Sequence, residues 1–220
     1  MKITPTKTPF IVKKLFPDYV WEISTKKKEL YLTFDDGPTP DITHWVLDAL
    51  KPFNAKATFF CIGDNVTKHP EIFSQIVNEG HSIGNHTHNH IKGWNTETEQ
   101  YLGNVSIAEE IITSQMNRLT PVDLFRPPYG QIKPKQGKKL MALGYKIVMW
   151  DVLSFDWDKT VSNQECLNHV ISKSKNGSIV VFHDSIKASN NMKFALPKVL
   201  EHFTEKGFSF KSISSIDTLE

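Results

Sequence analysis

The sequence predicts an α/β fold in which parallel strands alternate with helices packed outside them. Short apolar runs rich in β-branched and aromatic residues alternate with helical periodicity about seven times along the 220 residues. Ionisable residues follow nearly every strand-like run, as expected where the carboxyl ends of parallel strands share one edge. The length suits one domain of moderate size. Periodicity alone leaves two architectures open, a doubly wound sheet and a barrel.

Composition excludes several classes of protein. Hydrophobic residues make up 39% and charged residues 23% of the chain, which is typical of a globular protein and argues against disorder. The formal net charge of +2 gives no case for nucleic-acid binding. No apolar run approaches the ~20 residues that span a bilayer, so we expect no membrane insertion. Cys61 and Cys166 are too few and too far apart for a disulfide framework.

The N-terminal region differs from the rest of the chain. We predict an irregular lead-in over 1–27 and one folded domain over 28–220, and we expect a monomer. No apolar run of roughly 7–15 residues follows the first lysine, so the sequence shows no secretory signal. If Met1 is the natural start, this predicts a cytoplasmic protein.

The first half of the chain begins the alternation. Strand-like runs rich in β-branched and aromatic residues span 30–34, 57–61 and 81–84. The first of them stops at an Asp-Asp-Gly-Pro turn. Apolar residues at helical spacing cover 41–52 and 65–79, and Gly80 is expected to cap the second of these helices.

The second half of the chain continues the pattern. A long helix is expected over 97–117, with its apolar residues on one stripe. Further strands are expected at 123–125, 145–150, 177–182 and 208–210. Further helices are expected at 134–143, 162–174 and 192–206. The whole chain therefore contains about seven strand-then-helix units.

Two histidines after the third strand suggest a metal site. His86 and His90 are four residues apart, and on a helical turn their Cβ atoms would lie ~5–6 Å apart on one face. Neutral imidazole suits zinc and other late transition metals. The alternative is a polar surface segment that happens to hold histidines. Asp35 and Asp36 offer a carboxylate ligand after the first strand. The side chains of adjacent residues on an extended chain point opposite ways. One aspartate can therefore bind the metal while the other contacts the water molecule bound to that metal.

Five motifs in order resemble the signature of one enzyme family. The chain is similar to the polysaccharide deacetylases, family 4 of the carbohydrate esterases, over roughly residues 28 to 211. The matching segments are Thr33-Phe34-Asp35-Asp36-Gly37-Pro38, His86-Thr87-x-x-His90, Arg126-Pro127-Pro128-Tyr129, Asp156-Trp157 and His183-Asp184. The resemblance implies a distorted (β/α) barrel of about seven parallel strands in a single domain, so residues 28–220 would form the deacetylase catalytic domain.

The resemblance also implies a role for each motif residue. One divalent metal, most often Zn²⁺ with Co²⁺ or Ni²⁺ as substitutes, would be held by Asp36, His86 and His90. The general base would be Asp35, held by Arg126 in a bidentate pair. The general acid would be His183, oriented by Asp156. The backbone N–H of Tyr129 would help to stabilise the oxyanion.

The chain departs from the family pattern at two places. The fourth motif often reads Asp-x-x-Asp-Trp, but Leu153 stands at the first acid here and Asp151 lies two positions earlier. This leaves open which aspartate pairs with the general acid. The fifth motif is often Leu-x-His, and here Val181 would line the pocket for a small acyl group. We also expect Trp157 and Pro128 to contact the carbohydrate substrate.

The resemblance favours a metal-dependent hydrolase that removes N-acetyl groups from N-acetylglucosamine-type sugars by a metal-bound water. Chitin-like oligosaccharides and peptidoglycan-derived saccharides are both candidate substrates. The alternative is an O-acetyl esterase on xylan-type polysaccharide. A general acid at His183 favours the amide mildly, because an amine leaves poorly unless it is protonated. A non-catalytic binding module is disfavoured because every motif residue is present. Phosphoryl transfer is disfavoured because it gives the two histidines no task.

Overall fold

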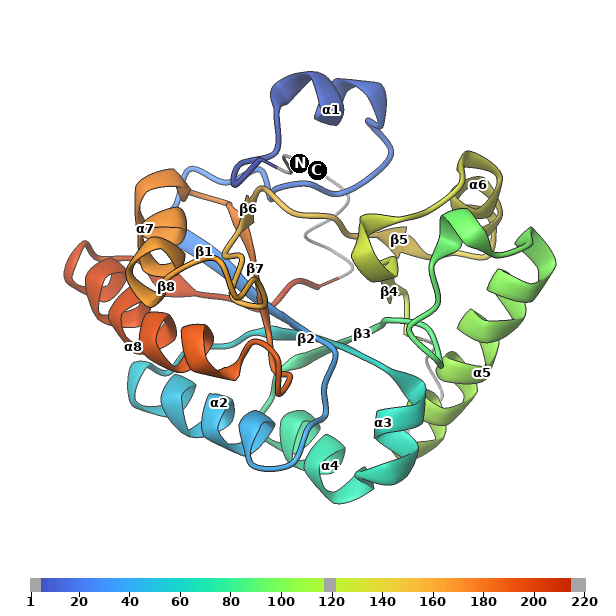
Figure 1. Cartoon of the computed structure of the whole chain (residues 1–220), viewed down its shortest axis with the longest axis horizontal. Coiled ribbons are helices and arrows are strands. Elements are labelled where there is room, and N and C mark those ends of the chain that lie inside the picture. Colours follow the sequence, from blue (N-terminus) through green and yellow to red (C-terminus); the bar gives the residue numbers. More distant parts are fainter. Residues whose placement is uncertain (1–4, 117–121, 215–220) are drawn as a thin grey trace.

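A computed structural model describes residues 5–116 and 122–214, and its strands form one curled sheet ringed by helices (Figure 1). The strands are β1 Glu29–Asp35, β2 Thr58–Cys61, β3 Ser82–Asn85, β4 Leu124–Phe125, β5 Lys146–Ile147, β6 Val152–Leu153, β7 Ile179–His183 and β8 Ser209–Phe210. They follow the order β5-β4-β3-β2-β1-β7-β6, with β8 paired to β1 off this path. Every pair of these strands is parallel, which confirms the predicted distorted (β/α) barrel of about seven parallel strands.

The helices pack around the outside of this sheet. They are α1 Phe10–Leu15, α2 Ile42–Leu50, α3 Gly63–Lys68, α4 Pro70–Asn78, α5 Thr98–Met116, α6 Pro134–Ala142, α7 Asn163–Lys173 and α8 Ser189–Glu205. Short 3₁₀ turns occur at η1 Lys51–Phe53, η2 Gly93–Asn95 and η3 Pro128–Gly130. No helix in the described ranges has the length and hydropathy that a membrane span requires.

Alternation along β1 places Asp35 at the carboxyl end of the barrel strands. Leu30, Leu32 and Phe34 join the apolar cluster that includes α2 and α8 side chains, while Tyr31 joins a smaller cluster on the other face of the sheet. The same alternation puts Asp35 on the face of Tyr31, at the carboxyl end of the strand. The neighbouring strands β2 and β7 pair with β1 in register up to this end, where Asp35 lies opposite His183.

The N-terminal segment is hydrogen-bonded to both ends of the sheet order. On the β5 side, the N–H of Val20 donates to the carbonyl of Ile147 at 2.9 Å, and the carbonyl of Val20 accepts from the N–H of Met149 at 2.7 Å. On the β6 side, Thr8 N donates to Asp151 O at 2.9 Å. The expectation of an irregular segment over 1–27 is wrong for the six residues of α1. The segment bridges the gap between β5 and β6.

The predicted helix 65–79 is two helices. Pro70 has no N–H to donate and restricts the residue before it, so α3 ends at Lys68 and His69 between the two helices has a φ of −133° and a ψ of 57°. Gly80 ends α4 with a φ of 77°, as predicted.

Several other elements also differ from the prediction. The predicted strand 145–150 is paired in the sheet only at Lys146–Ile147, because Val148 pairs with the N-terminal segment through a bridge to Val20. The chain then forms β6, which the sequence did not predict as a separate strand because Asp151 interrupts the apolar run. Helix α2 ends at Leu50 and continues as the 3₁₀ turn η1, and α8 begins three residues before the predicted position at 192.

Candidate active site

The two aspartates after β1 face different partners. Asp35 is 4% exposed and continues the strand, whereas Asp36 has a φ of 84° and leaves it. The carboxylate of Asp35 contacts Arg126, and that of Asp36 contacts two histidines. The expected division between the two acids is therefore present in the geometry.

The two histidines converge through a loop and not through a helical turn, which corrects the sequence prediction. After β3 the chain turns with positive φ at Thr87 (65°) and His90 (54°). This turn brings the rings of His86 and His90 to 5.1 Å between centroids. Residues with positive φ interrupt a helix. The two histidines, four residues apart, therefore converge through the turn of this loop.

Asp36, His86 and His90 fit a divalent metal ion. One ligand atom from each lies within 4.8 Å of the others, and Asp36 Oδ1 is 3.2 Å from His90 Nε2 and 3.8 Å from His86 Nε2. This oxygen is buried and accepts no hydrogen bond from the described residues. A buried carboxylate oxygen facing two imidazole nitrogens suits an ion such as zinc.

The protonation of these groups also suits a metal. Burial lowers the pKa of His86 to about 4, so its imidazole is neutral at pH 7. Its Nδ1 lies 2.7 Å from the carbonyl oxygen of Arg126, to which a neutral ring donates, and Nε2 is then left as the lone-pair donor. Burial alone would raise the pKa of Asp36, but His90, His183 and His86 together hold it well below its ordinary value.

Arg126 is fully buried and holds Asp35 from one side. Its Nη1 donates to Asp35 Oδ1 and to Thr33 Oγ1, both at 2.7 Å. Its Nε and Nη2 donate to the carbonyls of Val148 and Met149. The expected bidentate pair is therefore wrong, because the second guanidinium nitrogen is used by the backbone. Only one oxygen of Asp35 is engaged by the arginine.

The histidine at the end of β7 pairs with Asp156. His183 Nδ1 is 2.9 Å from Asp156 Oδ1, and the backbone N–H of His183 donates to Asp156 Oδ2 at 2.7 Å. Burial alone would lower the pKa of His183, but Asp156, with Asp36 and Asp35, raises it to about 9. The ring is therefore charged at neutral pH.

Asp151, the other candidate partner of His183, contacts the N-terminal segment instead. Its carboxylate accepts from Lys13 at 2.6 Å, Lys7 at 2.8 Å and Ser178 at 2.6 Å. These contacts tie the N-terminal segment to the barrel. The alternative left open by the sequence is thus decided in favour of Asp156.

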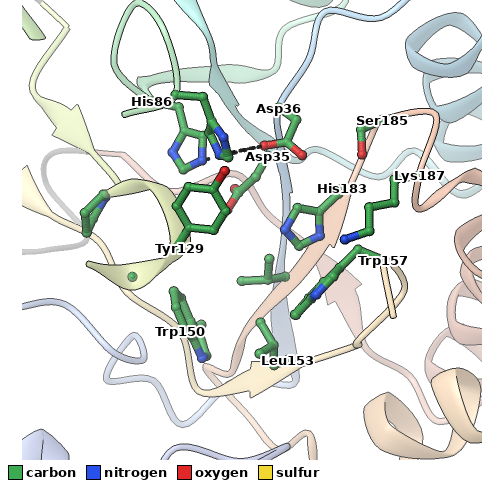
Figure 2. Close-up of a pocket in the computed structure, with 14 residues that line it drawn as sticks. Asp35, Asp36, His86, Tyr129, Trp150, Leu153, Trp157, His183, Ser185 and Lys187 are labelled. Carbon is green, nitrogen blue, oxygen red and sulfur yellow. Dashed lines mark ion pairs between the residues drawn. The ribbon is translucent and has the colours of Figure 1, made fainter. Parts of the chain in front are cut away.

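A cavity of about 410 Å³ brings most of the predicted residues together (Figure 2). Both aspartates, both histidines, His183, Tyr129, Trp157 and Val181 line it. Trp157 packs edge-on against His183 with ring centroids 4.7 Å apart. The proline that lines this cavity is Pro127, and Pro128, which we expected to contact the substrate, is not among the lining residues. Tyr129 has a φ of 59°, and its ring lies 4.6 Å from that of His90.

Sequence reasoning missed several lining residues. Trp150, Leu153, Ser185 and Lys187 also face the cavity (Figure 2). The ring of Trp150 packs on Gly130, and a Cβ at Gly130 would lie 2.6 Å from that ring. Gly130 also has a φ of 65°, which favours glycine. An aromatic residue at the end of an apolar run was a usable signal for Trp150, since strand ends carry the site in this fold.

Asp184 is a buried carboxylate that braces the loop after β1. It accepts from Gly37 N at 3.0 Å and from the hydroxyl of Thr43, and its own N–H donates to Asp35 O at 3.1 Å. Burial raises its pKa to about 7, and the nearby Asp36 adds to this effect. A Cβ at Gly37 would lie 2.0 Å from Asp184 Oδ2, so the close approach requires glycine. The loop that carries Asp36 is thus held from β7.

Comparison with known proteins gives consistent matches. The family model described as polysaccharide deacetylase matches residues 22–148. A peptidoglycan-N-acetylglucosamine deacetylase of Bacillus cereus is 34% identical over 198 residues, covering 89% of this chain and 91% of that protein. A second B. cereus protein of the same name is 37% identical over 204 residues, covering 90% and 71%. A crystal structure of a peptidoglycan N-acetylglucosamine deacetylase superposes with a TM-score of 0.85 at 35% identity, covering 94% of this chain and 95% of that one.

Proposed function

The chain belongs to the polysaccharide deacetylase family and is a hydrolase of that family, and from this premise we propose that it removes N-acetyl groups from N-acetylglucosamine-type sugars. Chitin-like oligosaccharides or peptidoglycan-derived saccharides would be the substrates. The observation that carries the proposal is the placement of three sets of groups around one cavity. A protonated His183–Asp156 pair faces the Asp36, His86 and His90 cluster, and Asp35 lies between them.

Asp36, His86 and His90 would hold one divalent ion, with Zn²⁺ preferred and Co²⁺ or Ni²⁺ as substitutes. When bound, such an ion supplies an acidified water and polarises the acyl carbonyl. The chain prepares the site by keeping His86 neutral and by fixing its Nδ1 on the carbonyl of Arg126.

Asp35 would act as the general base. Arg126 engages Oδ1, and within the described residues no hydrogen bond occupies Oδ2. This oxygen is therefore free to accept a proton from the attacking water. The buried guanidinium fixes the carboxylate in position.

His183 would act as the general acid. Its charged ring faces the cavity, and Asp156 fixes the ring through Nδ1, so that Nε2 carries the proton to donate. Proton transfer to the departing nitrogen allows the amine to leave. The backbone N–H of Tyr129 would stabilise the charge that develops on the acyl oxygen, and Trp157 and Val181 would shape the space around the sugar and the acetyl group.

The O-acetyl esterase remains the second candidate. The paired acid favours an amide, since an alkoxide leaves with less help than an amine. The similar B. cereus proteins are named for N-acetylglucosamine deacetylation, which supports the same choice.

Acetate release on a substrate panel tests the proposal. The panel contains chito-oligosaccharides, peptidoglycan fragments and acetylxylan, each with and without added Zn²⁺, Co²⁺ or Ni²⁺. We expect release from one or both N-acetylated glycans, dependent on metal. Release from acetylxylan alone would establish the esterase instead.

A further inference from the structure

The turn after β7 carries two polar side chains that face the catalytic cavity. Ser185 and Lys187 follow His183, the last residue of the strand, and line the cavity beside it (Figure 2). In Figure 2 the ammonium of Lys187 points toward the side of the cavity where His183 and Trp157 lie. The chemistry proposed above uses neither Ser185 nor Lys187.

The backbone of this turn is held at both ends. Asp184, before the turn, is buried and accepts from the N–H of Gly37 at 3.0 Å. Ala188, at its end, is also buried, and its N–H donates to the carbonyl of Ser185 at 3.1 Å. The side chains of Ser185 and Lys187 therefore emerge at a fixed place on the rim of the cavity.

Lys187 differs from the other charged groups of the cavity because it has no counter-charge in contact. The other charged side chains each contact a partner: the pairs are Asp35 with Arg126, Asp36 with His90, and His183 with Asp156. Over the described ranges, the Lys187 ammonium and the Ser185 hydroxyl take part in no hydrogen bond or ion pair. Hydrogen bonds from Thr160 are the main cause of the lowered pKa of Asp158, and the charge of Lys187 is the smallest cause.

An unpaired ammonium at this place predicts a negative charge on the substrate. A saccharide that enters the cavity displaces water from Lys187, and a cation that loses water is destabilised unless an anion replaces that water. A carboxylate replaces the water better than a neutral hydroxyl does, because it brings the opposite charge. The hydroxyl of Ser185 offers a second donor to the same group.

The position of the charge on the substrate follows from the role of His183. As the general acid, His183 would contact the sugar nitrogen, which an N-acetylated hexosamine carries on C2. The carbons next to C2 are C3, with its oxygen, and C1, which joins the next sugar. Because the turn with Lys187 begins directly after His183, a carboxylate attached at either position would face this turn.

We propose that Ser185 and Lys187 form a carboxylate-binding site at the rim of the catalytic cavity, and that this site selects an acidic saccharide. The carboxylate is carried on O3 of the deacetylated sugar or on the sugar joined at its C1. This inference rests on the proposed deacetylase function. It favours peptidoglycan-derived saccharides over fully N-acetylated chitin-like ones, which are uncharged.

Equilibrium binding tests the site separately from catalysis. The probes are the disaccharide of N-acetylglucosamine and N-acetylmuramic acid, whose lactyl group is a carboxylate, and the methyl ester of the same disaccharide. Calorimetry uses the full chain with Asp35→Asn, which should bind the disaccharide without hydrolysing it. We expect the free acid to bind more tightly than the ester by roughly 5- to 10-fold, and added salt should reduce this preference.

Further substitutions in the Asp35→Asn chain assign the preference to the turn. Lys187→Gln should abolish the preference for the free acid, Lys187→Arg should keep it, and Ser185→Ala should weaken it by a few-fold. The matched control is Lys138→Gln, which removes an exposed lysine of α6 that does not line the catalytic cavity. It should leave the preference unchanged, and circular dichroism melts should show that every variant folds.

Acetate release separates this proposal from the proposed function. In the chain that retains Asp35, Lys187→Gln should lower the ratio of kcat/KM on the acid to kcat/KM on the ester, and mass spectrometry of the product shows which ring lost its acetyl group. Equal binding of acid and ester, or a preference that survives Lys187→Gln, would overturn the carboxylate site even if acetate is released. A preference that depends on Lys187 without acetate release would support the site and refute the deacetylase activity.

Discussion

At the scale of single residues, three carboxylates near the site are set apart by their contacts. Asp35 faces a buried guanidinium, Asp156 faces an imidazolium and Asp36 faces two imidazole nitrogens. Each carboxylate therefore has a nitrogen-bearing partner of a different kind. The proposed division into base, orienting group and metal ligand follows from these partners.

Asp35→Asn tests the base. The amide keeps the shape of the carboxylate but accepts no proton, so we expect kcat to fall by at least ~10²-fold. Metal content, measured by atomic emission, should not change because Asp35 is not a proposed ligand. Activity within a few-fold of the unmodified enzyme would show that another group activates the water.

Asp156→Asn tests the pKa of the acid. The carboxylate of Asp156 raises the pKa of His183, so its removal should lower that pKa and make the ring lose its proton at lower pH. The alkaline limb of the kcat/KM profile should therefore move to lower pH. A limb that stays in place would mean that His183 does not set it.

At the scale of elements, the strand ends and the loops between them build the site. Asp184, one residue beyond β7, braces the loop after β1 through Gly37 and Thr43. The proposed metal ligand Asp36 lies on that loop. Two elements far apart in sequence thus fix the position of one proposed ligand.

Asp184→Ala should loosen this loop. Gly37 N–H and the Thr43 hydroxyl lose their acceptor, and we expect zinc affinity, measured by competition with a chelator, to fall by ~10-fold or more. Thr43→Ser keeps the hydroxyl and serves as the control with unchanged affinity. His90→Ala, which removes a proposed ligand, sets the scale for complete loss. Wild-type affinity in a folded Asp184→Ala protein would refute the bracing role.

At the scale of the whole molecule, the N-terminal segment is held to the barrel through Asp151. Its carboxylate is buried and accepts from Lys7, Lys13 and Ser178. These contacts outweigh burial and lower its pKa. Because the pKa of Asp151 is lower in the folded protein than in the unfolded chain, its ionised carboxylate stabilises the fold at pH values above the unfolded-state pKa. This stabilisation is lost as the pH falls through the folded-state pKa.

Asp151→Asn should therefore destabilise the protein at neutral pH. We expect the free energy of unfolding to fall by about 2–3 kcal/mol, since Lys7 loses its carboxylate partner and Lys13 keeps only Glu22. Urea titrations should show the difference between variant and unmodified protein shrinking as the pH falls below about 4. A difference that is independent of pH would indicate lost packing and not lost charge pairing.

Much of the fold and the site follows from sequence because local patterns determine them. Short apolar runs located β1, β2, β3 and β7, and the motifs indicated residues that line the cavity. Contacts between residues far apart in the sequence could not be predicted from local patterns. The choice of Asp156 over Asp151 depends on which lysines reach Asp151 from residues 7 and 13, and no local pattern encodes that. The loop geometry at Thr87 likewise depends on tertiary packing.

The most direct test of the proposed chemistry compares His183→Ala on an amide and on an activated ester. If His183 protonates the leaving nitrogen, amide deacetylation should fall by ~10²–10⁴-fold. Hydrolysis of a nitrophenyl ester, whose phenolate leaves without an acid, should fall only a few-fold. The alkaline limb of amide hydrolysis should also vanish in the variant. Equal losses on both substrates, or retained amide hydrolysis, would contradict the assignment of His183 as the general acid.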